Sequence, residues 1–205
     1  MARTATAAPP TSRGAATREK IVTAAAELVH GHGVAAMSLD RVREASDTSK
    51  SQLYHYFGDK DELVLAVIQR QAECVLEFHG AALARVTSLA GLRRWRDEVV
   101  QTTRRTHGAE GCPLGSLVPE LSRTPRSRAA LAASFADWEA QFAERLATLR
   151  PRAGRGSRQE VADLATTLVA ALQGGLLLAQ ATRSTRPLEL ALDAALERIE
   201  LKLRE

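Results

Sequence analysis

Residues 48–60 hold the densest group of side chains that could do chemistry through hydrogen bonds. They read TSKSQLYHYFGDK and carry hydroxyls, ammonium groups, an amide, an imidazole and two phenols. These groups form no catalytic arrangement. Side chains of this kind do read base edges in the major groove and hold phosphates. The run therefore indicates noncovalent recognition, and nucleic acid is the first candidate partner.

The spacing divides this run into a packing face and a contact face. Leu53 and Phe57 lie one helical turn apart and Tyr56 can join them, so these three predict the buried face of a short helix. Tyr54 adds a phenol on the exposed side. Four further groups can enter a groove from the other face: Lys50, Ser51, Gln52 and His55.

The N-terminus of this short helix suits an anion. Thr48 and Ser49 place hydroxyls where free backbone N–H groups and the helix dipole favour a phosphate. Ser49 and Gln52 also fit the capping-box pattern, and the Gln52 amide cannot fully serve both a cap and a base. We favour the base, where a bidentate amide would select adenine, while Lys50 would favour guanine or phosphate.

Three helices must position these groups. Thr17 is a good N-cap for a first helix, which ends at Gly31 and Gly33. A short second helix is expected over 38–45, a turn over 46–48 and a third helix over 49–57. A short helix, a tight turn and a second short helix, braced by a preceding helix, are the ingredients of a helix-turn-helix.

The stretch from Thr48 to Leu63, TSKSQLYHYFGDKDEL, resembles the signature of the TetR family of transcriptional regulators. The similarity extends back through TREKIVTAAAELVHGHGVAAMSLDRV and covers about the first 65 residues. The resemblance implies phosphate contacts from six residues: Thr17, Arg18, Ser38, Ser49, Tyr54 and Lys60. It implies contacts to base edges or their adjacent phosphates from four: Lys50, Ser51, Gln52 and His55.

The turn departs from the family pattern at two positions. Family members often have glycine where this chain has Asp47, and alanine where it has Ser46. Aspartate tolerates left-handed dihedrals better than most residues, so we expect the turn to survive. The aromatic residues of the run could instead be core residues of any helical bundle, and we interpret Tyr56 and Phe57 in that way.

The charge balance gives little support of its own. The chain of 205 residues has a net charge of +4 and an isoelectric point near 9.5. Residues 1–57 contain seven Lys or Arg against five Asp or Glu, so local placement matters more than a broad basic field. The arginines crowd into 93–105 and 123–158, and we interpret much of this excess as the bias of a GC-rich genome.

The whole chain is predicted to be all-α, with about nine helices. Beyond the third helix we expect helices near 60–85, 88–107, 114–121, 125–149, 157–183 and 187–205, with a break or kink at Pro119. Residues 1–16 read as a disordered arm. The expected division is 17–63 for DNA binding and 64–205 for effector binding and dimerisation.

The last two helices carry apolar stripes, which we interpret as a homodimer interface within residues 161–203. The first stripe consists of Val161, Leu164, Leu168, Leu172, Leu176 and Ala179. The second consists of Leu188, Ala191, Leu192, Ala195, Leu196 and Ile199. An ordinary internal core is the alternative. In the TetR family the matching helices form a four-helix dimer interface.

The middle of the chain would hold an effector pocket, because sparse aromatic and polar groups stand there among aliphatic residues. The candidates are Phe78, Trp95, His107, Cys112, Leu117, Phe135, Trp138, Phe142 and Gln173. Core packing is the alternative for each. The segment GCPLGSLVPELS resembles a Cys-Pro-Leu-Gly element of one TetR subgroup, and Cys112 could sense oxidation if it were exposed and activated.

Other functional classes find no support in the sequence. No nucleophile elbow, zinc-protease motif or phosphate loop is present, so we expect neither an enzyme nor a cofactor. Cys74 and Cys112 make no disulfide framework, and His79 and His107 are too isolated for a metal site. No secretory signal or membrane helix is expected, which predicts a cytoplasmic protein.

These observations predict a repressor that a small, largely apolar ligand releases from a palindromic operator. Two readings remain beside it. One is a helical ligand-binding protein or enzyme without a DNA role. The other keeps DNA binding but makes the protein an activator, or a regulator that responds to thiol oxidation.

Overall fold

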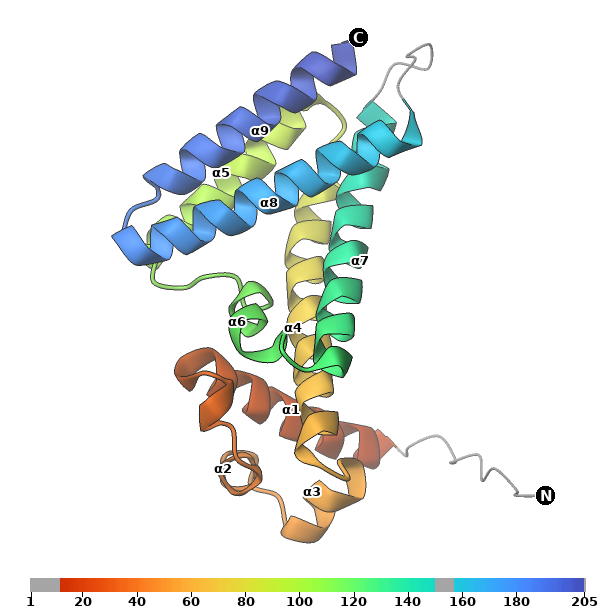
Figure 1. The fold of residues 1–205 in the computed structure, drawn as a ribbon, viewed down its shortest axis with the longest axis vertical. Coiled ribbons are helices and arrows are strands. Elements are labelled where there is room, and N and C mark those ends of the chain that lie inside the picture. Colours follow the sequence, from red (N-terminus) through yellow and green to blue (C-terminus); the bar gives the residue numbers. More distant parts are fainter. Residues whose placement is uncertain (1–11, 150–156, 205) are drawn as a thin grey trace, which may run out of the picture. The chain divides into compact units, whose positions relative to one another are not determined.

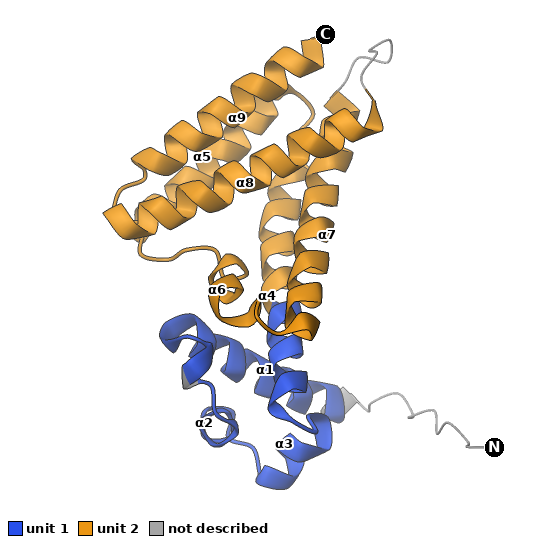
Figure 2. Ribbon diagram, viewed as in Figure 1, with its two compact units in different colours: residues 1–70 blue, residues 71–205 orange. Residues whose placement is uncertain are grey.

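The computed structural model describes residues 12–149 and 157–204. Within these ranges the protein is all-α, with nine α-helices, two short 3-10 helices and no strand, which confirms the predicted fold class. The chain forms two compact units, residues 1–70 and residues 71–205 (Figure 2). Helix α4 (Lys60–Leu83) contributes residues to both.

Unit 1 contains α1 (Ser12–His32), η1 (Val34–Ala36), α2 (Leu39–Ala45), α3 (Lys50–Tyr56) and the start of α4. Its core is formed by apolar side chains, all 5% exposed or less: Ile21, Ala25, Val29, Val42, Leu53, Phe57, Leu63 and Val67. This core fixes α2 and α3 against α1, so the polar face of α3 has a rigid support.

Helix α1 begins earlier than expected. It starts at Ser12, so Thr17 lies inside the helix and is not its N-cap. Ala15 and Ala16 explain the difference, because alanine has the highest intrinsic helix propensity and extends the helix toward the N-terminus. The disordered arm expected over 1–16 is therefore wrong for 12–16, while residues 1–11 lie outside the described part of the chain.

Unit 2 contains the rest of α4, α5 (Leu89–Arg105), η2 (Gly115–Leu117), α6 (Val118–Leu121), α7 (Pro125–Leu149), α8 (Arg158–Thr182) and α9 (Arg186–Arg204) (Figure 1). Helix α8 packs against both α7 and α9, and α9 packs against α5. Pro119 lies in the first turn of the short helix α6, where the missing N–H is not needed.

Helix α8 is long and apolar enough to cross a membrane by length and composition alone. Its packing gives another reason for this composition. Leu164, Leu168 and Leu172 are fully or almost fully buried within unit 2, whereas Leu177 and Leu178 are exposed. The helix is thus apolar on more than one face, and only one of these faces is covered within the subunit.

Candidate nucleic-acid interface and ligand-binding region

The turn between α2 and α3 has the left-handed residue that its shape requires. Asp47 has a φ of 47°, as expected for an aspartate that replaces the usual glycine. Ser46 is buried, and its hydroxyl lies 2.8 Å from that of Thr48 and donates to the carbonyl oxygen of Arg43 at 3.3 Å. These bonds hold the turn and orient the start of α3.

Thr48 differs from its expected role. Its side chain is only 8% exposed and is paired with the Ser46 hydroxyl, so it braces the turn and does not offer its hydroxyl to a phosphate. The sequence could not show this, because Thr48 and Ser49 are both hydroxyl residues at a helix start. Only the fold decides which of the two faces inward.

Ser49 and Gln52 form the capping box that their spacing predicts. The backbone N–H of Gln52 donates to Ser49 Oγ at 3.1 Å, and the backbone N–H of Ser49 donates to Gln52 Oε1 at 2.8 Å. We had expected the Gln52 amide to serve a base rather than the cap. In the structure the oxygen forms the cap and the NH2 group of the same amide is left unused by it, so the contact of Gln52 with a base stays a prediction.

The exposed face of α3 gathers most of the predicted contact residues. Lys50, Ser51, Gln52, Tyr54 and His55 are all exposed, while the intervening Leu53 is buried. The Tyr54 ring is 47% exposed, and Lys50 Nζ lies 5.9 Å from its centroid. A large exposed aromatic residue beside a cation suits a polyanionic surface, and the contacts of these residues to DNA stay predictions.

The predicted phosphate-binding residues outside α3 are less uniform. Arg18, Ser38 and Lys60 are exposed, and Thr17 is half-buried. The Arg18 guanidinium lies 5.3 Å from the centroid of the Phe57 ring, so it is held close to the C-terminal end of α3. Ser38 caps α2 by accepting the Arg41 N–H at 3.2 Å. Lys60 begins α4, and Asp59 accepts the Glu62 N–H at 2.8 Å.

Three of the predicted ligand-binding residues lie in a buried aromatic cluster of unit 2: Trp95, Trp138 and Phe142, each 1% exposed or less. His79, which we had considered only as a metal ligand, completes the cluster. Its ring centroid lies 4.9 Å from that of Trp138, and its Nδ1 accepts the indole N–H of Trp95 at 3.2 Å. Burial lowers the pKa of His79 to about 3, so the imidazole is neutral at neutral pH.

The sequence contained a signal for this role of His79. It lies at helical spacing from Val75, Ala82 and Leu83, all of which are buried on α4. Phe135 borders the cluster, with its ring centroid 6.1 Å from that of Trp138. The Trp138 indole nitrogen is buried and has no hydrogen-bond partner among the described residues.

Cys112 and Gln173 come together where the Cys-Pro-Leu-Gly turn meets α8, and Leu117 is buried in the 3-10 helix η2 that follows the turn. The Cys112 thiol is buried and accepts the Gly115 N–H at 3.4 Å, so it caps the turn that leads into η2 and α6. Burial raises the pKa of this thiol, although backbone N–H groups at Gly115 and Leu114 oppose the shift. The Nε2 of Gln173 is buried without a partner in the described chain.

The remaining ligand candidates lie elsewhere. Phe78 is 47% exposed and lines an open hollow of about 500 Å³ beside Arg94, Gln101 and Arg105. His107 is exposed, in a turn with a φ of 50°. The structure therefore does not bring all nine candidates together. The reason is that Phe78 points outward from α4, whereas His79 points into the core.

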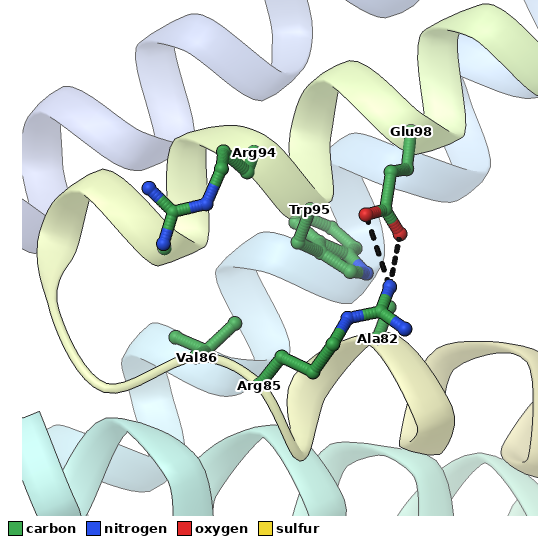
Figure 3. A pocket seen from close by; sticks show the side chains of 7 residues that line it. Ala82, Arg85, Val86, Arg94, Trp95 and Glu98 are labelled. Atoms are coloured by element: carbon green, nitrogen blue, oxygen red, sulfur yellow. Dashed lines mark hydrogen bonds and ion pairs between the residues drawn. The ribbon is translucent and has the colours of Figure 1, made fainter.

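A neighbouring hollow of about 240 Å³ lies where α4 ends and α5 begins (Figure 3). Trp95 lines it, and Arg85 closes one side by donating to both Glu98 oxygens at 3.0 and 2.9 Å. Among the nine predicted ligand residues, Trp95 is the one that lines this hollow. The described residues contain no group of three or more His, Cys, Asp or Glu side chains placed to hold a metal ion.

The apolar stripes that we had assigned to a dimer interface are mainly internal. In both stripes the leucines at the centre are buried within the subunit, including Leu168, Leu172, Leu188 and Leu192 at 0% exposure. Gly175 explains the close approach of α8 and α9, because a Cβ there would lie 2.8 Å from the Cα of Leu188. The stripes therefore join α8 to α9.

Other leucines of the same two helices are exposed in the subunit: Leu177 at 66%, Leu178 at 53%, Leu190 at 56% and Leu201 at 65%. Gly174 lies on this outer side, where a Cβ would meet no atom within 4 Å. The residue range 161–203 thus contains an uncovered apolar surface, made by a different set of side chains from the predicted one.

Several arginines of α5 have specific partners on α9. Arg93 pairs with Glu200, Arg96 with Asp193 and Arg104 with Glu189, each at 2.8 Å. A hydrogen bond from Arg93 lowers the pKa of Glu200, and the same bond raises the pKa of Arg93. Our interpretation of these arginines as genomic bias is therefore incomplete, because three of them hold α9 along α5.

Comparisons with known proteins agree with this geometry. Residues 21–67 match the model of the bacterial regulatory proteins of the tetR family, and residues 88–194 match the C-terminal domain of LmrA/YxaF-like transcriptional regulators. The first match spans the helix-turn-helix, and the second spans α5 to the middle of α9.

Individual relatives and solved structures lead to the same family. An HTH-type transcriptional regulator in the lacX 3′ region of Lactococcus lactis is 33% identical over 84% of this chain and 88% of its own length. The HTH-type transcriptional regulator LmrA of Bacillus subtilis is 26% identical over 83% of this chain and 90% of its own length. A TetR-family regulator from Cytophaga hutchinsonii has the same fold, with a TM-score of 0.76 at 18% identity over 96% of this chain and 100% of its own. These proteins are regulators and not enzymes, and the chain belongs to the TetR family of DNA-binding transcriptional regulators.

Proposed function

We propose that the protein is a homodimeric repressor that leaves a palindromic operator when a small, largely apolar ligand binds to unit 2. The observation that carries this proposal is the combination of an exposed polar face on α3 with an uncovered leucine surface on α8 and α9. One short helix reads few base pairs. Two-fold symmetry doubles the contacts and places the reading helices about 34 Å apart, one turn of DNA.

The leucine surface supports the homodimer. Leu177, Leu178, Leu190 and Leu201 are each more than half exposed. Burying a leucine side chain is worth about 1.5–3 kcal/mol relative to leaving it in water, so a second copy that covers four of them gains substantial free energy. The interface within 161–203 is thus proposed for this outer face of α8 and α9.

The proposed operator contacts come from the exposed residues of unit 1. On α3 they are Lys50, Ser51, Gln52, Tyr54 and His55. Around it they are Thr17, Arg18, Ser38, Ser49 and Lys60, which would hold phosphates. Thr48 contributes through the turn that it braces and not through its hydroxyl. A protein that binds the chromosome of a bacterium works in the cytoplasm, and we place it there.

Buried donors in unit 2 support a small-molecule effector. Trp138 Nε1 and Gln173 Nε2 have no hydrogen-bond partner in the described chain. An unpaired buried donor costs about 1–3 kcal/mol, and a ligand that offers an acceptor to it would remove this cost. The surrounding aromatic and aliphatic side chains favour a ligand that is otherwise apolar.

Control by oxidation of Cys112 is less well supported. The thiolate is the reactive form of cysteine, and burial raises the pKa of this thiol. The thiol is moreover engaged as a cap by the Gly115 N–H. We therefore favour a ligand over a thiol switch, and a Cys112→Ser protein should still respond to the ligand.

Sedimentation and DNA binding test the proposal together. Leu177→Asp should convert the dimer into a monomer and lower affinity for the DNA upstream of its own gene by at least about tenfold. Ala90→Asp adds the same charge at another exposed position, at the start of α5, and should leave both properties unchanged. A monomeric wild type, or a Leu177→Asp dimer of full affinity, would contradict the proposed interface.

A double variant tests the proposed DNA contacts of unit 1. Tyr54→Phe combined with Lys60→Ala removes a phenol and an ammonium from the exposed surface and should weaken operator binding without dissociating the dimer. Full affinity of this variant would show that the proposed contact surface is misplaced. A small apolar compound should release the wild-type protein from the DNA if the protein is a repressor. An activator should stay bound when the compound is added.

A further inference from the structure

The hollow beside Phe78, on the outer surface of unit 2, is separate from the buried aromatic cluster. Its volume is about 500 Å³, and every residue that lines it belongs to unit 2. Helix α4 contributes the Phe78 ring, which is 47% exposed. Helix α5 contributes one of its faces, because the other lining residues recur at helical spacing: Arg94, Asp97, Glu98, Gln101, Thr102 and Arg105. We call this site the Phe78 hollow.

Both carboxylates of the Phe78 hollow are neutralised by arginines that do not line it. Asp97 pairs with Arg96 at 3.0 Å, and Glu98 pairs with Arg85 at 2.9 Å. These carboxylates are therefore already engaged from outside the hollow. They leave the two arginines that do line it without an acidic partner.

These two arginines, Arg94 and Arg105, remain free to bind an anion. Both are exposed, and neither has an ion-pair partner among the residues that the structure describes. In Figure 3 both dashed lines from Glu98 reach Arg85, and Arg94 points away from this pair. Eleven residues separate the two arginines, so they lie about 16 Å apart along the axis of α5. The hollow thus has two separate cationic groups and an exposed aromatic ring on the neighbouring helix.

We propose that the Phe78 hollow binds an extended acidic peptide segment of a partner protein, with one carboxylate on Arg94, one on Arg105 and an apolar side chain against Phe78. An extended peptide advances about 3.3 Å per residue, so carboxylates about five residues apart span the two arginines. A guanidinium binds a carboxylate through two parallel hydrogen bonds, and aromatic residues and arginine are enriched in protein interfaces. This partner is additional to the DNA and the effector of the proposed repressor.

The lining between the two arginines favours a peptide over nucleic acid. Asp97 and Glu98 lie in this part of α5, and their oxygens accept hydrogen bonds and cannot bind a phosphate. A nucleic-acid backbone is a continuous polyanion, so some of its phosphates would face these carboxylates. A peptide can carry its negative charges at the two ends alone. A small molecule fits less well, because small-molecule pockets enclose most of their ligand and this hollow is open.

Selection from random peptides tests the inference on the full-length protein. A displayed library of 12-residue peptides would first be depleted on the double variant Arg94→Gln, Arg105→Gln, which removes peptides that bind elsewhere. The remaining peptides would then be selected on wild type. We expect peptides with two acidic residues about four to six positions apart and an apolar residue between them. No enrichment on wild type, or enriched peptides without acidic residues, would overturn the inference.

Calorimetry with a synthetic copy of an enriched peptide assigns the contacts. Arg94→Gln and Arg105→Gln should each weaken binding by at least about fivefold. Arg126→Gln removes the same charge at an exposed position on α7 and should bind the peptide as wild type does. Phe78→Ser should also weaken binding by about fivefold while its sedimentation stays that of wild type. A change in oligomeric state would instead assign the hollow to an interface between copies of the chain.

Charge reversal separates recognition from a structural role of the arginines. The double variant Arg94→Glu, Arg105→Glu should lose the acidic peptide and bind a copy in which both acidic residues are replaced by lysine. Loss of the acidic peptide without gain of the lysine peptide would refute direct pairing.

A random-sequence duplex provides the nucleic-acid arm of the test. Arg126→Glu combined with Arg128→Glu changes the charge equally at exposed positions of α7. The duplex should bind this control and the charge-reversed hollow variant with similar affinity. A larger loss for the hollow variant would assign the hollow to nucleic acid and overturn the inference.

Discussion

The buried imidazole of His79 makes the stability of unit 2 depend on pH. The side chain is 6% exposed, and its only ring nitrogen without a proton, Nδ1, accepts the Trp95 indole N–H. Protonation would replace this acceptor by a donor that faces another donor, in a buried site lined by the rings of Trp95, Trp138 and Phe142. The folded protein therefore resists protonation of His79, while the unfolded chain does not.

The size of the effect follows from the two pKa values. Burial lowers the pKa from 6.5 in the unfolded chain to about 3 in the folded protein. Between these values the unfolded state binds more protons than the folded state, so stability falls as the pH falls through 6.5 and the loss levels off below 3. From pH 7 to pH 5 the free energy of unfolding should decrease by about 1.9 kcal/mol.

Urea unfolding followed by tryptophan fluorescence measures the loss of stability in unit 2, because both tryptophans, Trp95 and Trp138, lie in that unit. His79→Gln keeps an acceptor for Trp95 but does not titrate, so its stability should change far less between pH 7 and pH 5. His107→Gln is the control, since this histidine is exposed and should leave the wild-type slope unchanged.

The choice of pH range separates this histidine from the carboxylates. A hydrogen bond from Thr185 lowers the pKa of Glu189, and one from Arg93 lowers that of Glu200. Both groups thus lose their ionised form only below the ordinary value of 4.5. A wild-type slope equal to that of His79→Gln would refute the reasoning. If His79→Gln does not fold, an NMR titration of the His79 ring in the wild-type protein replaces this comparison. Protonation of His79 above pH 5 would refute the reasoning in the same way.

Two further substitutions test backbone and packing with paired controls, each measured by urea unfolding. Gly175→Ala places a methyl group 2.8 Å from the Cα of Leu188 and should cost about 1–3 kcal/mol, whereas Gly174→Ala meets no atom of its own subunit within 4 Å and should preserve the folded subunit. Asp47→Ala should lower the free energy of unfolding by about 1 kcal/mol, because residue 47 has a φ of 47°. Asp47→Gly should be neutral or stabilising. Equal effects of the two substitutions would contradict strain at this turn.

The parts of the fold that sequence reasoning predicted well depend on local interactions. Ser38, Ser49, Ser88 and Ser157 were each expected to begin a helix, and each accepts a backbone N–H three residues further along the chain. Such caps need only a few consecutive residues, so their pattern can be recognised without knowing the tertiary structure. The left-handed conformation of Asp47 was predictable for the same reason.

The parts that were missed depend on which neighbour covers a side chain. Thr48 and Ser49 have the same chemistry, yet the first is buried against Ser46 and the second caps α3. Phe78 and His79 are adjacent on α4, and the residue that looks more hydrophobic is the exposed one. Helical spacing can group residues into faces, but it does not say which face meets the core.

Helix α8 shows this difficulty most clearly, because two of its faces are apolar for different reasons. Leu164, Leu168 and Leu172 fill the subunit core, whereas Leu177 and Leu178 remain exposed and, in our proposal, meet a second copy of the chain. A helix that serves two cores carries fewer polar residues than one with a solvent face, which explains why its composition alone would suit a membrane. In a subunit considered alone, the side chains that stay exposed are therefore better indicators of a dimer interface than the most regular leucine stripe.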